Sequence, residues 1–390
     1  MSDNNSTANT IPAEWTKTLQ GEICRLGNGE KSQVAGFPYF EVKYLRGQKP
    51  KTLVNEGRFV LKDNKVIIVD GENSGEVFTI PENGYMGSTC KVLEINPKID
   101  EKFLLYFIAS KKQLYRNKKK GSAIPHLDKK LFAEMPFAYP ELLSEQQRIV
   151  AKIEELFSKL DAGIESLKKA KLLLAVYRQA VLKESFEQKE NWRCVKLSDI
   201  GAINLGRQRS PKNISKDYPT KYIRAANITE TGIDVSDILE MEFTPKEREK
   251  YYLKKNDIIL SEASGSASQV GKPAIWKNEI ENCCFQNTVI RHRIAKDNPE
   301  YVFWYYKYLY MSGYFSRKVG GVGINHLGAN NFSDFEINIP VSMEEQSSIV
   351  SQIESRLTVC DKIERTVNES LEKADVLRRS ILKKAFEGGL

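Results

Sequence analysis

One stretch near the middle of the chain reads Ser144-Glu-Gln-Gln-Arg-Ile-Val-Ala-Lys-Ile-Glu154, and it returns two hundred residues later as Glu344-Glu-Gln-Ser-Ser-Ile-Val-Ser-Gln-Ile-Glu354. Identities continue at this constant offset, without a gap, as far as Phe186 and Phe386. Chance matches do not hold register for more than forty residues, so the repeat indicates an internal duplication.

Both copies lie in proline-free stretches whose apolar side chains recur at alternating steps of four and three, as in a heptad seam. Capping boxes formed by Ser144 with Gln147 and by Ser342 with Glu345 are expected to begin them. The pattern predicts two long helices, each of about 65 Å at 1.5 Å per residue. Helices of that length are not needed for the core of one compact domain.

The regions before the two helices also repeat. Both begin with a tryptophan, Trp15 and Trp192, alternate β-branched runs with Gly and Pro, and continue into a helical stretch. We expect an α+β fold in which two mixed α/β globules are separated by two long antiparallel, coiled-coil-like helices, with a pseudo-two-fold internal repeat. The predicted boundaries are a disordered lead-in at 1–10, globules at 11–140 and 191–340, and helices at 141–190 and 341–390.

Composition excludes several classes of protein. No apolar run approaches the ~18 residues of a membrane span, and the N-terminus does not resemble a signal peptide, so a cytoplasmic protein is expected. The six cysteines form no Cys-x-x-Cys pair, and the three histidines are not at metal spacing, so no metal site is expected. Gly265–Pro273 has the wrong spacing for a P-loop, and no Asn-Pro-Pro-Tyr element of an adenine methyltransferase is present. We therefore expect neither an active site nor a cofactor.

The architecture itself points to a ligand. Two heptad seams in one chain can pair antiparallel and bury each other, which relates the globules by an approximate two-fold axis. Duplex DNA has the matching symmetry, with half-sites at a fixed spacing. The formal charge of +8 agrees with a polyanionic partner. Because the globules differ in their middles, their half-sites should differ in sequence.

The repeated entry into the long helices resembles the specificity subunit of type I restriction-modification systems. It is a proline, then Glu-Gln and Ile-Val, present as Pro140…Glu145-Gln-Gln-Arg-Ile-Val150 and Pro340…Glu345-Gln-Ser-Ser-Ile-Val350. The runs Tyr222-Ile-Arg-Ala-Ala-Asn-Ile228 and Asn256-Asp-Ile-Ile-Leu260 are similar to stretches common in that family's target-recognition domains. The first globule matches less well, with Phe37-Pro-Tyr-Phe-Glu-Val42 in place of the former run.

The resemblance implies that each globule is a target-recognition domain that reads one half of a split, asymmetric site in double-stranded DNA. It implies that the helices fix the gap and dock two methyltransferase subunits, and through them restriction subunits. S-adenosylmethionine and ATP would belong to those partners, and the chain itself would be non-catalytic.

Candidate DNA contacts are Lys and Arg for phosphates, and Arg, Lys, Asn, Gln and Ser for bases. In the first globule they are Lys43, Arg46, Gln48, Lys49, Lys51, Lys112, Arg116, Lys118 and Lys119. In the second they are Arg207, Arg209, Lys212, Arg224, Asn227, Ser266, Gln269, Arg317 and Lys318. His126 and His326 recur in both copies, and a structural loop histidine is as good an interpretation as a DNA contact. Candidate partner-docking residues are Glu145, Gln146, Arg148, Lys152, Glu345 and Gln346.

Two alternatives stay open at the level of sequence. One is a DNA-specificity adaptor of a type IIB-like or other two-half-site methylation system. The other is a structural coiled-coil protein with β-rich ends, which would not bind DNA in a sequence-specific, salt-dependent manner.

Overall fold

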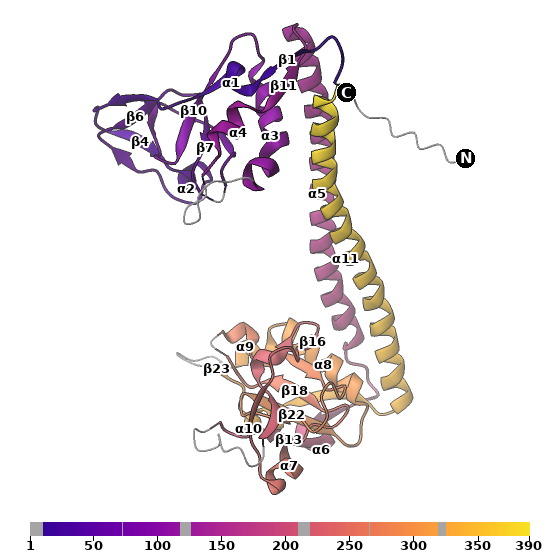
Figure 1. The fold of residues 1–390 in the computed structure, drawn as a ribbon. Coiled ribbons are helices and arrows are strands. Elements are labelled where there is room, and N and C mark those ends of the chain that lie inside the picture. Colours follow the sequence, from indigo (N-terminus) through magenta and orange to yellow (C-terminus); the bar gives the residue numbers. More distant parts are fainter. Residues whose placement is uncertain (1–10, 72, 118–125, 210–218, 265, 319–324) are drawn as a thin grey trace. The chain divides into compact units, whose positions relative to one another are not determined.

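The computed structural model describes residues 11–71, 73–117, 126–209, 219–264, 266–318 and 325–390 (Figure 1). The predicted lead-in at 1–10 and the candidates Lys118, Lys119 and Lys212 lie outside these residues. The chain divides into two compact units: Met1–Lys168 with Asn368–Leu390, and Lys169–Val367. Each unit therefore contains one globule together with a part of each long helix.

The two long helices are α5 (Leu143–Ser185) and α11 (Met343–Phe386), which confirms their prediction. The expected start of α5 was wrong, because the helix begins before Ser144 and its first turn is closed by hydrogen bonds from the Glu145 and Gln146 amides to the Leu142 carbonyl. Ser342 precedes α11, and its hydroxyl accepts a hydrogen bond from the Glu345 amide at 3.3 Å.

The described residues of the first unit's globule form three sheets. Strands β1 (Thr16–Leu19) and β11 (Pro136–Tyr139) pair antiparallel beside the start of α5. A four-stranded sheet has the order β2-β10-β7-β8, formed by Cys24–Gly27, Cys90–Ile95, Lys65–Ile68 and Val77–Thr79. A five-stranded sheet has the order β3-β6-β9-β4-β5, formed by Glu30–Ser32, Gly57–Val60, Gly84–Met86, Phe37–Phe40 and Leu53–Val54. The helices are α1 (Gln20–Ile23), α2 (Val42–Leu45), α3 (Glu101–Asn117) and α4 (Lys129–Ala133).

The second globule repeats this plan. Strands β12 (Trp192–Lys196) and β24 (Glu336–Pro340) pair antiparallel. The four-stranded sheet β13-β22-β18-β20 consists of Gly201–Leu205, Val289–Ile294, Ile258–Ser261 and Pro273–Ile275. Smaller sheets are β17-β14-β21 (Leu239–Glu242, Pro219–Ile223, Cys284–Phe285), β15-β16 (Ile228–Thr229, Gly232–Ile233) and β19-β23 (Ala263–Ser264, Asn325–His326). The helices are α6 (Leu197–Ile200), α7 (Pro245–Tyr251), α8 (Pro299–Met311), α9 (Tyr314–Lys318) and α10 (Ala329–Ser333), with 3-10 turns η2 (Ala225–Asn227) and η3 (Ala267–Gln269).

The two globules agree where they meet the helices and differ in their middles. The paired strands next to the helices and the four-stranded sheets correspond strand for strand. A five-stranded sheet in the first globule stands where the second has a three-stranded one among its described residues. Both of these sheets contain one parallel pairing, β4 with β9 and β14 with β21, so the divergence alters a shared plan.

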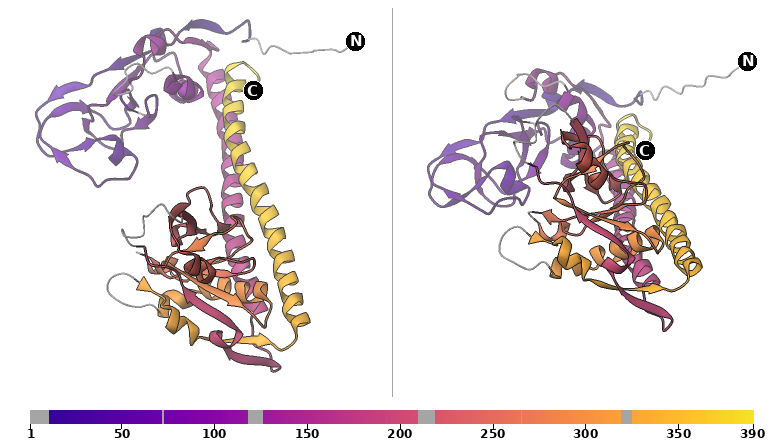
Figure 2. Two further views of the ribbon diagram at one scale, coloured as in Figure 1. Left: turned by 60° about the horizontal axis from the view of Figure 1, so that its bottom comes forward. Right: turned by 90° about the horizontal axis from the view of Figure 1, so that it is seen from below.

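An aromatic side chain at the end of one long helix packs into each globule. In the first unit, Phe386 at the end of α11 lies edge-on to Phe103 and Phe107 of α3, with ring centroids 5.1 and 5.3 Å apart. In the second, Phe186, which follows α5, lies 5.4 Å from the ring of Tyr301 and 4.9 Å from that of Tyr305. Each globule is therefore packed against the start of the helix that follows it and the end of the other (Figure 2).

The predicted heptad seam is only partly buried. Val181 of α5 and Cys360 and Val367 of α11 are almost fully covered. Tyr177 and Ile363 stand at the four-and-three spacing that predicts the seam, but they are 42% and 44% exposed, so the predicted burial was wrong for these two positions. Within the described part of the chain, no helix is both long enough and apolar enough to cross a membrane.

Candidate functional site

The turn between β7 and β8 collects basic side chains that are distant in sequence. Arg46, just after α2, forms an ion pair with Glu76. Lys112 on α3 lies 3.9 Å from the same carboxylate. One turn further along α3, Arg116 donates to the Asn73 side chain at 2.9 Å. Two groups of candidates, predicted separately, are thus brought to one place, which we call the β7–β8 corner and define by residues 70, 71 and 73–76 and the side chains that contact them.

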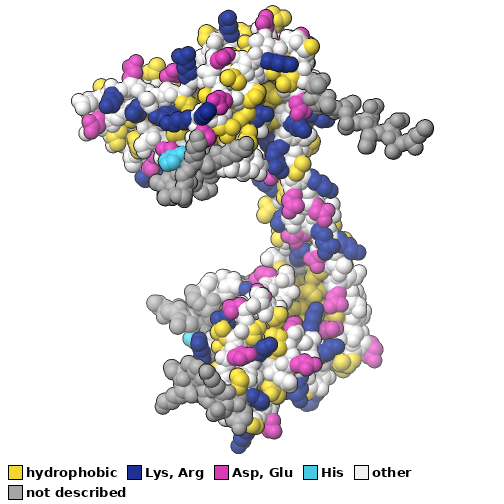
Figure 3. All heavy atoms as spheres, viewed as in Figure 1, with side chains coloured by type: hydrophobic (Ala, Val, Ile, Leu, Met, Phe, Trp, Pro, Cys, Tyr) yellow, Lys and Arg dark blue, Asp and Glu magenta, His cyan; other side chains and the backbone are white. Residues whose placement is uncertain are grey.

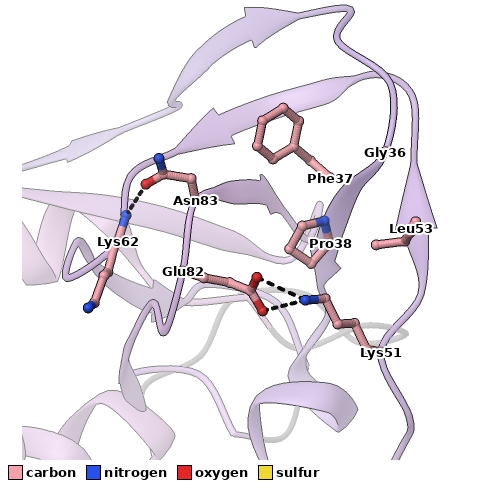
Figure 4. A pocket seen from close by; sticks show the side chains of 8 residues that line it. All are labelled: Gly36, Phe37, Pro38, Lys51, Leu53, Lys62, Glu82 and Asn83. Atoms are coloured by element: carbon pink, nitrogen blue, oxygen red, sulfur yellow. Dashed lines mark hydrogen bonds and ion pairs between the residues drawn. The ribbon is translucent and has the colours of Figure 1, made fainter.

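One of the remaining candidates near α2, Lys51, lines a shallow cavity of about 680 Å³ (Figure 4). The Lys51 ammonium group donates to both carboxylate oxygens of Glu82 at 2.7 and 2.8 Å. Lys49 is paired with Glu41 at 2.5 Å, whereas Lys43 and Gln48 are exposed. Because Lys49 and Lys51 are exposed pairs, their carboxylates can be exchanged for phosphate at little cost in stability.

An equivalent place in the second globule joins η3, α9 and β23. Helix α9 contacts η3, and Gly271 has φ +75° with no room for a Cβ atom against the ring of Phe315. Arg317 and Lys318 are exposed here; the Arg317 guanidinium donates to the Ser312 carbonyl at 2.8 Å, and the Lys318 ammonium lies 5.7 Å from the centroid of the Tyr314 ring.

Two further candidates, Ser266 and Gln269, lie around η3, which α9 contacts. The Ser266 and Ser268 hydroxyls are 2.8 Å apart, and the Gln269 amide donates to the Ser266 carbonyl. We call this place the β18–η3 corner and define it by residues 262–264 and 266–269 with α9 and β23. It follows β18 as the β7–β8 corner follows β7.

Several predicted contacts of the second globule have internal roles instead. Arg207 is 13% exposed; it pairs with Glu247 at 2.7 Å and stacks on the Phe243 ring. Burial opposes ionisation of Glu247, but hydrogen bonds from Arg207 and Thr244 hold its pKa below the usual value. A DNA contact by Arg207 would require this pair to open. Its neighbour Arg209 is exposed.

The other two predicted contacts with internal roles, Arg224 and Asn227, lie at the η2 turn. Asn227 is 3% exposed, and its side-chain amide donates to the carbonyls of Asp234 and Asp237 at 3.0 Å. Arg224 forms an ion pair with Asp237. These bonds could not be foreseen from the sequence, because polar side chains that stabilise a turn and polar side chains that read bases belong to the same residue types.

Two candidate docking residues are fully buried. The Gln146 side chain accepts from the Asp100 amide at 2.7 Å and donates to the Pro140 carbonyl at 2.9 Å. Gln346 does the same with the Asn298 amide and the Pro340 carbonyl, at 2.8 and 3.0 Å. These glutamines hold each globule to its helix, and such buried side chains present no surface to a partner.

The other docking candidates remain accessible. Arg148 and Lys152 are exposed on α5 and form ion pairs within the helix, with Glu145 and Glu155. Glu345 is half-buried and accepts from the Trp192 indole at 3.2 Å and from Lys189 at 3.3 Å. The hydrogen bond from Trp192, followed by Lys189 and Asn191, lowers the pKa of Glu345 although burial opposes it.

Sequence reasoning missed the acidic partners. Asp70 pairs with His126, Glu76 with Arg46, and Glu262 with His326. The signal that could have found two of them is an acid close behind a buried strand: Glu262 follows β18 directly, and Asp70 lies one position further along, after Val66–Val69. Lysine and arginine alternate with acidic side chains over the face shown in Figure 3. The described residues contain no group of three or more His, Cys, Asp or Glu able to hold a metal ion.

Comparison with known proteins agrees with this arrangement. Residues 12–172 and 189–373 both match the model of the type I restriction modification DNA specificity domain. The MjaVIII specificity subunit of Methanocaldococcus jannaschii is 25% identical over 404 residues, covering 93% of this chain and 91% of that protein. The EcoKI specificity subunit of Escherichia coli is 27% identical over 374 residues, covering 87% and 78%.

Solved structures share the fold. A chain from a study of complex assembly and conformational transition of the type I R-M system has a TM-score of 0.74 at 16% identity and covers 98% of this chain and 100% of that one. The HsdS subunit of Thermoanaerobacter tengcongensis has a TM-score of 0.58 at 17% identity and covers 97% and 98%. With both globules and their helices matched by one model, the chain belongs to the family of type I restriction-modification DNA specificity subunits.

Proposed function

We propose that this chain selects the DNA sequence for a type I restriction-modification complex, with each globule reading one half of an asymmetric bipartite site. The observation that carries the proposal is the repetition of the globule-to-helix attachment. Gln146 and Gln346 make the same bonds 200 residues apart, and Phe386 and Phe186 close the corresponding cores. Two reading units mounted in the same way suit a site with two halves.

The asymmetry of the site follows from the divergent middles. The small sheets β3-β6-β9-β4-β5 and β17-β14-β21 differ in strand number within the described residues, and the basic residues around them differ in position. Direct reading of bases depends on the side chains presented to the major groove. Two different sets of side chains should read two different half-sites.

Docking of two methyltransferase subunits on the long helices is the second element of the proposal. Leu172, Leu173 and Val176 of α5 are 71%, 58% and 62% exposed, although a helix that only filled a core would cover them. Exposed apolar side chains clustered on a charged helix are typical of a protein-docking surface. Restriction subunits would join through the methyltransferases, which would bind S-adenosylmethionine, while ATP would serve the restriction subunits.

Methylome sequencing of a host carrying this chain with its methyltransferase tests the proposal. We expect one methylated motif made of two unlike halves with a fixed gap. Replacing residues 191–340 by the corresponding segment of another specificity subunit should change one half only. A single undivided motif, or a change of both halves after the replacement, would contradict independent reading by two globules.

The type I relatives also bear on the alternative of a type IIB-like adaptor. The MjaVIII and EcoKI proteins are named specificity subunits of type I enzymes, and they are matched over most of their length. This supports a role in which cleavage and methylation are carried out by separate partner chains.

A further inference from the structure

We propose that His126 and His326 are equivalent contacts to the DNA phosphate backbone, each positioned by a carboxylate of its own globule. The inference rests on the proposed DNA binding by the globules. It adds a pair of contacts that set the placement of the duplex in the same way on both halves of the protein, whatever sequence each half reads.

The two histidines are held by the same combination of bonds. In the first globule, Nδ1 of His126 lies 2.7 Å from Oδ1 of Asp70, the two residues form an antiparallel bridge, and the Leu127 amide donates to the Val69 carbonyl at 2.7 Å. The backbone bridge fixes the position of the His126 main chain, and the contact with the carboxylate fixes the orientation of its imidazole ring.

The second globule repeats this arrangement. Nδ1 of His326 lies 3.1 and 3.2 Å from the Glu262 carboxylate oxygens, His326 pairs with Ala263, and the Leu327 amide donates to the Glu262 carbonyl at 2.9 Å. The backbone bonds are the same, but the carboxylate comes from a different position: Glu262 corresponds to Val69, since each accepts from the leucine after the histidine, and Ala263 corresponds to Asp70. The ring is nevertheless bound through the same nitrogen, Nδ1, in both globules. A contact that is kept while its partner residue changes is more than a by-product of one local turn.

The exposed fractions of His126 and His326 differ from that of the third histidine, His292, which lies in the core. His292 is fully buried, and its Nδ1 lies 2.7 Å from the Tyr306 hydroxyl. The side chains of His126 and His326 are 51% and 56% exposed, while Glu262 is only 9% exposed. In the second globule the carboxylate thus faces inward and the imidazole outward, the arrangement expected of a positioned contact group; in the first, Asp70 is 33% exposed and still less exposed than its histidine. Histidine is visible at the surface of each unit in Figure 3.

The chemistry of the ring identifies the ligand. With Nδ1 bound to a carboxylate, Nε2 is the atom left for an outside partner. When the imidazole carries both protons, its Nε2–H donates a charge-assisted hydrogen bond to such a partner if that partner is an anion. The neighbouring side chains are cations that attract such an anion: Arg46, Lys112 and Arg116 in the β7–β8 corner, and Arg317 and Lys318 in the β18–η3 corner.

A phosphate is favoured over a base as the partner. The globules differ in the parts that would read sequence, but they share this histidine. A residue common to two readers of different half-sites carries no information about either sequence, and such residues position the duplex through its backbone. The contact should therefore affect affinity without affecting which sequence is methylated.

Two substitutions separate a DNA contact from a structural anchor. Asparagine places its amide nitrogen near the position of Nδ1, so His326→Asn keeps a donor for Glu262 and removes the outward nitrogen. Glutamine reaches the position of Nε2, so His326→Gln keeps an outward donor and loses the carboxylate bond. The matched control is Lys296→Gln, because Lys296 is exposed beyond the other end of β22 from the β18–η3 corner.

The measurement is DNA binding by the complex reconstituted with its methyltransferase subunits, on a duplex carrying the methylated motif, as salt is varied. We expect His326→Asn to weaken binding about tenfold and to reduce the salt slope by about one, with an unchanged melting temperature and motif. His326→Gln should regain part of the affinity, and Lys296→Gln should bind as the parent does. His126→Asn should repeat the effect, and the two should add.

The outcomes are distinguishable. Parental binding of His326→Asn, or a loss matched by a fall in melting temperature, overturns the inference and leaves the structural anchor. A changed motif overturns the phosphate assignment. If the parental complex itself fails to select a duplex with the motif, the proposed function fails, and the inference fails with it.

Discussion

Arg178 of α5 donates to Asp361 of α11 at 2.6 Å, and two hundred residues along the chain Arg378 of α11 forms an ion pair with Asp161 of α5. The first pair lies in the second unit and the other in the first unit. The second ion pair repeats the first with the two helices exchanged. The two pairs therefore fix the same antiparallel register of α5 and α11, one pair within each unit.

This register predicts how the recognised gap will respond to helix length. Seven residues inserted between 162 and 177 of α5, and seven between 362 and 377 of α11, preserve both ion pairs and the phase of the seam. They add about 10 Å of helix, or about three base pairs of duplex. Methylome sequencing should show the gap lengthened by about that amount. Altered half-sites would be incompatible with a spacer role, and insertion in α5 alone is the control that should impair assembly.

Gln146 offers a test of the globule-to-helix attachment. Gln146→Leu leaves the Asp100 amide and the Pro140 carbonyl without their partner, which should reduce the free energy of unfolding by about 3 kcal/mol. Denaturant unfolding measures the loss, and hydrogen exchange should localise it to the first unit. Gln147→Leu, at the neighbouring exposed position, should change stability by less than about 0.5 kcal/mol. Equal effects of the two changes would rule out the attachment role.

Substitution of Arg207 is predicted to reduce stability, and substitution of Arg209 is predicted to reduce DNA binding. Arg207→Ala removes the bonds to Glu247 and to the Glu242 carbonyl and should lower the free energy of unfolding by about 2 kcal/mol. Arg209→Ala, at an exposed site, should leave stability unchanged and weaken DNA binding by the reconstituted complex. Thermal melting and binding isotherms on the same preparations compare them. A stable Arg207→Ala protein with weakened DNA binding would restore Arg207 as a direct contact.

His292 should make the second unit sensitive to acid. Burial lowers the pKa of His292 to about 3, while a hydrogen bond at Leu197 acts in the opposite direction. His292 of the unfolded chain therefore binds a proton near pH 6.5, whereas His292 of the folded chain binds one only near pH 3. The free energy of unfolding therefore decreases as the pH falls through this window. From pH 6 to pH 4 the loss should be about 2.5 kcal/mol. The comparison of the parent with His292→Gln isolates it; identical pH slopes would contradict the assignment.

The long helices and the repeat could be predicted from sequence, because heptad spacing and proline-free runs are local signals that survive in any context. The sequence also located the divergence, in the middles of the globules. It placed the cap of α5 two residues late, at Ser144, whereas the helix begins at Leu143 and its first amides donate to the Leu142 carbonyl. Tyr177 and Ile363 fit the heptad spacing yet remain exposed, because a periodic pattern does not reveal which face a second helix covers.

The candidate site was predictable in composition but only partly in detail. Arg46 and Lys112 were correctly noticed as cations, yet their common partner Glu76 became apparent only in three dimensions. Gln146 was noticed because it repeats, and it was taken for a docking residue although burial makes it a structural one. A repeated polar residue has two physical explanations, a shared partner or a shared bond within the fold, and only burial distinguishes them. DNA contact by the exposed candidates stays a prediction.

The packing of α11 on the first globule also has a consequence for synthesis on the ribosome. Leu382, Ala385 and Phe386 belong to the same buried cluster as Trp15 and Phe103. The ribosome makes them only after the whole second globule has been translated. The first globule therefore emerges with an uncovered apolar surface and has to wait for about two hundred further residues, which at 5–20 residues per second takes about 10–40 seconds. During that interval the nascent chain can aggregate through this apolar surface. We expect a chaperone to bind the surface until α11 packs on it.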